Sequence, residues 1–156
     1  MSVSTLDRRT ALAAMLASAA ALPFQAAAAQ PRQAGGVRVD VGPLLANSGE
    51  PTAGWVAQEL PGAIEAALAS RGEAGTPVSV RIDYVLLGPN SGGVGPAGGS
   101  ADQMIGEVTS GGVTHPLRAT TTYYPMPQDN VMVEQSNRAR VTALARAFAD
   151  WIARGY

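Results

Sequence analysis

The chain has 156 residues, and its 11 basic and 12 acidic side chains give a formal net charge of −1. This balance argues against nucleic acid or an anionic membrane surface as the principal partner. Cysteine is absent, which excludes disulfides, thiol catalysis and cysteine-ligated metals, and lysine is absent, which excludes Schiff-base chemistry. Because His115 is the single histidine, the sequence predicts no metal site and no cofactor.

The first 29 residues have the pattern of a cleaved export signal. Arg8 and Arg9 precede an Ala/Leu-rich run, and Ala27 and Ala29 form an A-x-A cleavage site. The run is too short and too rich in alanine to be expected as a retained membrane anchor, and no later segment resembles a transmembrane span. We therefore predict a periplasmic protein with a single domain at 30–156.

The paired arginines resemble the signature of a twin-arginine signal peptide. An acidic residue, Asp7, precedes them, and the apolar Leu12 follows three positions after the second arginine. Ala11 and Ala13 depart from the family pattern, which has phenylalanine and lysine there. The resemblance implies export in the folded state; a general-secretion signal that happens to hold two arginines is the alternative.

A strand, a helix and a second strand are predicted in the first half of the domain. The segments 37–41 and 76–87 alternate apolar and polar residues, as half-buried strands do. Over 53–71, apolar residues recur every four positions, which indicates an amphipathic helix with Thr52 as its N-cap and a bend at Pro61. The two strands are expected to be parallel, with a right-handed crossover.

The strand at 76–87 is predicted to be central in the sheet. One set of alternating residues is expected to point toward the core: Val78, Val80, Ile82, Tyr84 and Leu86. The second half of this strand is apolar on both faces, which predicts that it is covered on both sides.

The segment 88–101 is predicted to be a glycine-rich crossing loop. It contains G-x-G-x-x-G at 93–98, but a strand and not a helix is expected next, so a nucleotide site is not predicted. The segments 103–109 and 113–124 then predict a β-hairpin around a glycine turn, with Pro116 marking an edge or a bend.

The last helix is predicted to run from an N-cap at Ser136 to Gly155. Its apolar stripe contains Val141, Leu144, Phe148 and Ile152. Four charged residues are placed largely on the opposite side: Arg138, Arg146, Asp150 and Arg154.

The elements together predict an α+β fold, a four-stranded mixed sheet in the order β-α-β-β-β-α with two helices packed on one face. This order is similar to that of envelope accessory domains of the lipopolysaccharide-assembly lipoprotein type. The resemblance covers the domain at 30–156 and implies an accessory role in the bacterial envelope. The cysteine that anchors such lipoproteins is missing, so neither membrane attachment nor partner residues are carried over.

A polar sheet face is the predicted binding surface. If both helices cover one side, the other side displays Arg38, Asp40, Ser79, Arg81, Asp83, Glu107, Arg118, Thr120, Thr122 and Tyr124. From this set we predict binding by Arg38, Arg81, Asp83, Arg118 and Tyr124. Such a face could dock a glycan, a lipid headgroup or another envelope protein, whereas the Arg–Asp pairs could equally be ordinary cross-strand ion pairs.

The predicted function is that of a non-enzymatic accessory or binding protein, acting through the sheet face or edge. The alternative is a small periplasmic hydrolase or ligand-modifying enzyme that uses His115 and a nearby carboxylate. No G-x-S-x-G motif is present, and Asp102, Glu107 and Asp129 lack the spacing of a calcium loop. We assign no catalytic residue.

Overall fold

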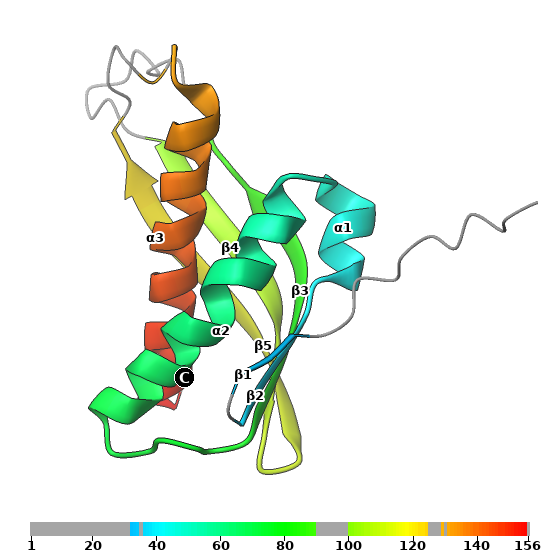
Figure 1. Cartoon of the computed structure of the whole chain (residues 1–156), viewed down its shortest axis with the longest axis vertical. Coiled ribbons are helices and arrows are strands. Elements are labelled where there is room, and N and C mark those ends of the chain that lie inside the picture. Colours follow the sequence, from blue (N-terminus) through cyan, green and yellow to red (C-terminus); the bar gives the residue numbers. More distant parts are fainter. Residues whose placement is uncertain (1–31, 35, 90–99, 125–128, 130, 156) are drawn as a thin grey trace, which may run out of the picture.

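The computed structural model describes residues 32–34, 36–89, 100–124, 129 and 131–155 (Figure 1). The predicted export signal, with Arg8, Arg9, Ala27 and Ala29, lies outside these residues, as does most of the glycine-rich loop. The described chain forms eight elements: β1 (Arg32–Ala34), β2 (Val37–Asp40), α1 (Gly42–Ser48), α2 (Thr52–Ser70), β3 (Val78–Leu86), β4 (Ser100–Ser110), β5 (Val113–Tyr123) and α3 (Val133–Arg154).

The strands form one mixed sheet in the order β1-β2-β3-β4-β5. β2 and β3 are parallel, as predicted, and the other neighbouring strands are antiparallel. The α+β class is therefore confirmed. The sequence prediction lacked β1 and α1, because three and seven residues are too short to establish a hydrophobic period.

Helices α2 and α3 lie side by side against the sheet (Figure 1). The predicted apolar stripe of α2 is buried, and so is that of α3, with Phe148 the largest fully buried side chain. α2 runs without interruption through Pro61, which is itself buried. The core lies between these helices and the sheet, and we call the opposite side of the sheet the open face.

Two predicted helix caps are wrong. Thr52 is the first residue of α2 and makes no capping bond; a Glu50 carboxylate oxygen instead accepts a hydrogen bond from the Gly54 backbone N–H at 3.1 Å. Ser136 lies inside α3, whose first residue is Val133. The predicted C-terminal end of α3 is confirmed, since Gly155 adopts the left-handed conformation with φ 78°.

A β-bulge at Asp83 reverses the predicted side-chain orientation in the second half of β3. Ile82 pairs with Gly106, and Tyr84 pairs with the next residue of β4, Ile105, so Asp83 is an extra residue. Beyond the bulge the alternation reverses: Val85 is buried, while Tyr84 is 45% and Leu86 is 51% exposed. The second half of this central strand is therefore covered on one face only, contrary to the prediction.

The hairpin between β4 and β5 is confirmed. Gly111 and Gly112 form its two-residue turn with φ of 58° and 82°, a left-handed geometry that favours glycine at both positions. β5 is an edge strand and continues through Pro116, which lacks a backbone N–H for pairing.

Candidate binding face

The strand register arranges the open face into rows, because directly paired residues on neighbouring strands project to the same face. The row nearest the Gly111–Gly112 turn crosses four strands and contains Arg38, Ser79, Thr109 and Thr114. The two threonine hydroxyls are hydrogen-bonded to each other, with 2.7 Å between their Oγ1 atoms. We call these four residues the hydroxyl row.

The next row is an ion-pair network around Arg81. Its Nε donates to Asp83 Oδ1 at 3.1 Å, and its Nη2 lies 3.4 Å from Glu107 Oε2 on β4. Asp40, the register partner of Arg81 on β2, accepts a hydrogen bond from the Gly42 backbone N–H at 2.8 Å. The cross-strand ion-pair partner of Arg81 is thus Glu107. Ion pairs between side chains this exposed each contribute about 0–1 kcal/mol to the stability of the fold.

The rows beyond the bulge are more apolar. Tyr84 and Ile105 are direct register partners, and Leu86 follows along β3 toward the strand end. Arg118 on β5 pairs in register with Ile105 and is exposed. We call Tyr84, Leu86 and Ile105 the apolar end of the open face; Arg118 adjoins it.

The five residues predicted for binding are spread over three parts of this face. Arg38 belongs to the hydroxyl row, Arg81 and Asp83 pair with each other, and Arg118 adjoins the apolar end. Tyr124 follows directly after β5 and is 64% exposed. The structure does not bring these five side chains into one pocket.

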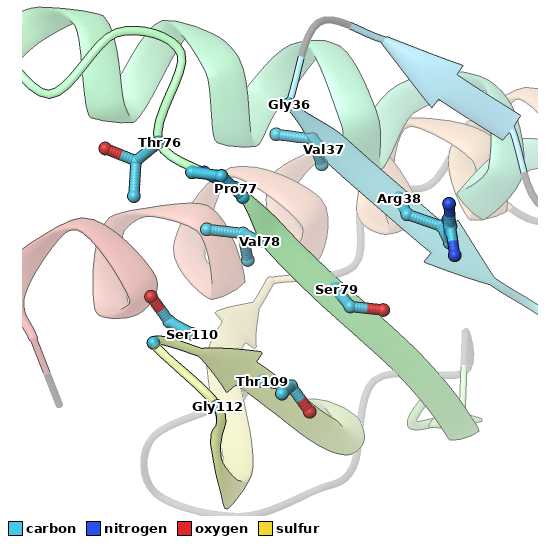
Figure 2. A pocket seen from close by; sticks show the side chains of 11 residues that line it. Gly36, Val37, Arg38, Thr76, Pro77, Val78, Ser79, Thr109, Ser110 and Gly112 are labelled. Carbon is cyan, nitrogen blue, oxygen red and sulfur yellow. The ribbon is translucent and has the colours of Figure 1, made fainter.

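An open hollow of about 700 Å³ lies at the hydroxyl-row end of the sheet (Figure 2). Arg38, Ser79 and Thr109 contribute to it from three adjacent strands, with their side chains directed to the same side of the sheet. Gly36, Pro77 and the glycine turn form another part of the wall. Val37, Val78 and Ser110 also line the hollow, which therefore extends around the end of the sheet toward the helix side. Its volume is in the range typical of small-ligand sites.

A buried ion pair that the sequence analysis missed lies on the other side of the sheet. Arg140 of α3 is 4% exposed and Asp102 of β4 is 1% exposed. The guanidinium binds both carboxylate oxygens, through Nε at 2.8 Å and through Nη2, and Nη2 also donates to the Gly88 carbonyl at 2.6 Å. The Gly88 N–H in turn donates to Asp102 at 2.9 Å. One cation therefore joins α3, β4 and the segment that follows β3.

A sequence signal for this burial existed. Arg140 lies four residues before Leu144, so it continues the apolar stripe of α3 by one turn in the N-terminal direction. An arginine at a core-facing position requires a buried acceptor, because an unpaired buried charge is very costly. The position of its partner on β4 could not be inferred, since nothing in the sequence gave the distance between the two elements.

Tyr123 extends the buried cluster. The Arg140 guanidinium lies over the Tyr123 ring, 4.1 Å from its centroid, and the Tyr123 hydroxyl bonds to Asp129 and to Ser136 Oγ at 2.9 Å. Burial, and next the hydrogen bond to Asp129, raise the pKa of the Tyr123 phenol. The phenol therefore stays protonated at neutral pH and can donate to Asp129. Since these groups satisfy one another, we interpret the cluster as structural.

The position of His115 bears on the alternative prediction, an enzyme that uses His115 and a nearby carboxylate. His115 pairs in register with Val108, and the neighbouring Glu107 pairs with Pro116. Adjacent strand residues project to opposite faces, so Glu107 and His115 are separated by the sheet.

Within the described ranges, no group of three or more histidine, aspartate or glutamate side chains could hold a metal ion. No helix of the described part is long and apolar enough to cross a membrane.

Comparisons with known proteins add no identification. No protein-family model matches the chain, and no curated protein sequence matches it significantly.

Proposed function

We propose that the chain is an exported, non-enzymatic binding protein of the bacterial envelope that acts through the open face of its sheet. The observation that carries the proposal is the uncovered second half of β3. Tyr84 and Leu86 are each about half exposed on a face that neither α2 nor α3 covers, and Arg118 lies on the same face across the intervening Ile105. Adjacent exposed aromatic, aliphatic and arginine side chains are characteristic of interaction surfaces.

The binding part of the proposal predicts contact at the apolar end. A photo-crosslinking residue at Leu86, in the exported full-length protein, is expected to capture an envelope component, and adding Arg118→Glu is expected to lower that capture at least fivefold. The same crosslinker at Arg146, an exposed position on α3 facing away from the sheet, is the matched control and should capture little. Equal capture at positions 86 and 146 would contradict binding through the open face.

The export part rests on the twin-arginine pattern of residues 1–29. Fusing residues 1–30 to a reporter that is active only after export in the folded state is expected to give reporter activity in the periplasm. Changing Arg8→Lys together with Arg9→Lys is expected to abolish it, because the twin-arginine route reads the paired guanidinium groups. Activity that persists in the double variant would contradict recognition of the paired arginines. A reporter inactive in both forms would contradict the twin-arginine route, because export in the unfolded state leaves this reporter inactive.

A further inference from the structure

We propose that the hydroxyl row binds an acidic saccharide, with Arg38 holding the sugar carboxylate and the row's hydroxyls meeting the sugar hydroxyls. The inference rests on the proposed function, because it assumes that the open face is a binding face. It assigns a ligand class to the hydroxyl row, which lies at the other end of the open face from the apolar end. The hollow of about 700 Å³ beside the Gly111–Gly112 turn would hold the ligand (Figure 2).

The charge of the hollow selects an anion. Of the residues that line it, Arg38 is the only ionisable one, and no carboxylate lines it. A guanidinium carries five N–H donors in a planar fork that matches a carboxylate. Arg38 can therefore hold a ligand carboxylate in addition to the contact it makes within the protein.

The hydroxyls select a ligand that both donates and accepts hydrogen bonds. Thr109 and Thr114 share one hydrogen bond, so one of their two protons remains able to donate elsewhere. Ser79 is exposed between Arg38 and Thr109 and adds a hydroxyl that can donate or accept. Sugar hydroxyls have the same dual capacity, and a sugar ring carries several of them at different positions.

The length of the row and the charges near it further restrict the class of ligand. Three strand spacings separate Arg38 from Thr114, a span of about 14 Å, so a ligand that uses the whole row must extend well beyond its acidic group. Asp40 and Glu107 belong to the next row, about 7 Å away along the strands. They would repel the nearly double charge of a phosphate monoester more than the single charge of a carboxylate.

The test uses the purified protein with its domain complete and D-glucuronate as the probe, followed by the backbone amide signals in NMR spectra. Glucuronate is expected to shift the signals of Ser79 and Thr109, and glucose and inorganic phosphate are each expected to bind at least tenfold more weakly. Arg38→Gln is expected to weaken glucuronate binding at least tenfold. Arg146→Gln, which removes an exposed arginine of α3 on the other side of the sheet, is the matched control and should change the affinity less than twofold.

A second variant separates the hydroxyls from the charge. Thr109→Val keeps the shape and the net charge and is expected to weaken glucuronate binding about threefold. The inference is overturned if glucuronate shifts no signal of the row, if Arg38→Gln leaves the affinity unchanged, or if phosphate binds as tightly as glucuronate. None of these results would affect the crosslinking expected at Leu86, because that position lies at the other end of the face. Failure at both ends would remove the proposed function itself.

Discussion

Replacing Arg140 by alanine is expected to lower the free energy of unfolding by about 3–5 kcal/mol, the cost typical of removing one partner from a buried ion pair. The change leaves the Asp102 carboxylate buried without its cation, and it leaves the Gly88 carbonyl without the donor at 2.6 Å. Urea denaturation followed by circular dichroism measures the loss.

A matched control lies two residues away on the same helix. Arg138 is 48% exposed, and its Nη2 lies 3.6 Å from a carboxylate oxygen of Glu59. Arg138→Ala should therefore cost less than about 1 kcal/mol. Joint replacement of Asp102 by leucine and Arg140 by methionine should cost less than Arg140→Ala alone, because no unpaired charge remains. If Arg140→Ala costs no more than Arg138→Ala, the buried pair does not hold the fold as argued.

Gly106→Ala is expected to destabilise the domain by about 2–3 kcal/mol, in the upper part of the range for overpacked cores. Gly106 faces the core opposite Ile82, and a Cβ at this position would lie 2.2 Å from the Arg81 carbonyl oxygen. That oxygen belongs to the backbone of the central strand beside the bulge, so it cannot move without disturbing the pairing of β3 and β4. Thermal and urea unfolding of the purified variant measure the effect.

Gly62→Ala is the matched control in the same assay, and it is expected to change stability in the opposite direction. Gly62 lies inside α2 and is exposed, and an added Cβ would have nothing within 4 Å apart from its chain neighbours and the backbone of its own helix. Alanine there should stabilise the domain by about 0.5–1 kcal/mol, because glycine loses more backbone entropy than alanine in a helix. A Gly106→Ala protein as stable as the parent would show that β3 and β4 can separate at the bulge without cost.

The stripes of α2 and α3 were predictable because a helix repeats its contacts every three to four residues, so burial leaves a periodic record in the sequence. The alternation of β2 and of the first half of β3 was predictable for the same reason, with a period of two. The helix starts were not, because capping depends on single side chains: Glu50 binds the N-terminus of α2 in place of Thr52.

The candidate site was predictable only as a set of residues on one face. Arg38, Arg81, Asp83 and Arg118 were expected there from alternation alone. Their grouping into rows depends on the pairing between strands, because the register decides that Arg38 adjoins Ser79 and that Arg81 adjoins Glu107. Register between strands distant in sequence leaves no local signal.

By itself, the sequence determined the α+β class, the parallel pairing of β2 and β3, the glycine turn of the hairpin and the charges available to the open face. Each of these follows from local period, from composition or from the strand–helix–strand order. Only the tertiary structure decided which apolar side chains the face displays. The single extra residue Asp83 turns Tyr84 and Leu86 outward, and Gly106 permits the close approach of β4 to β3 beside it. A bulge is a mismatch between two strands, so neither strand alone predicts it. The same holds for Asp102 and Arg140, which lie 38 residues apart and become partners only when α3 packs against the sheet.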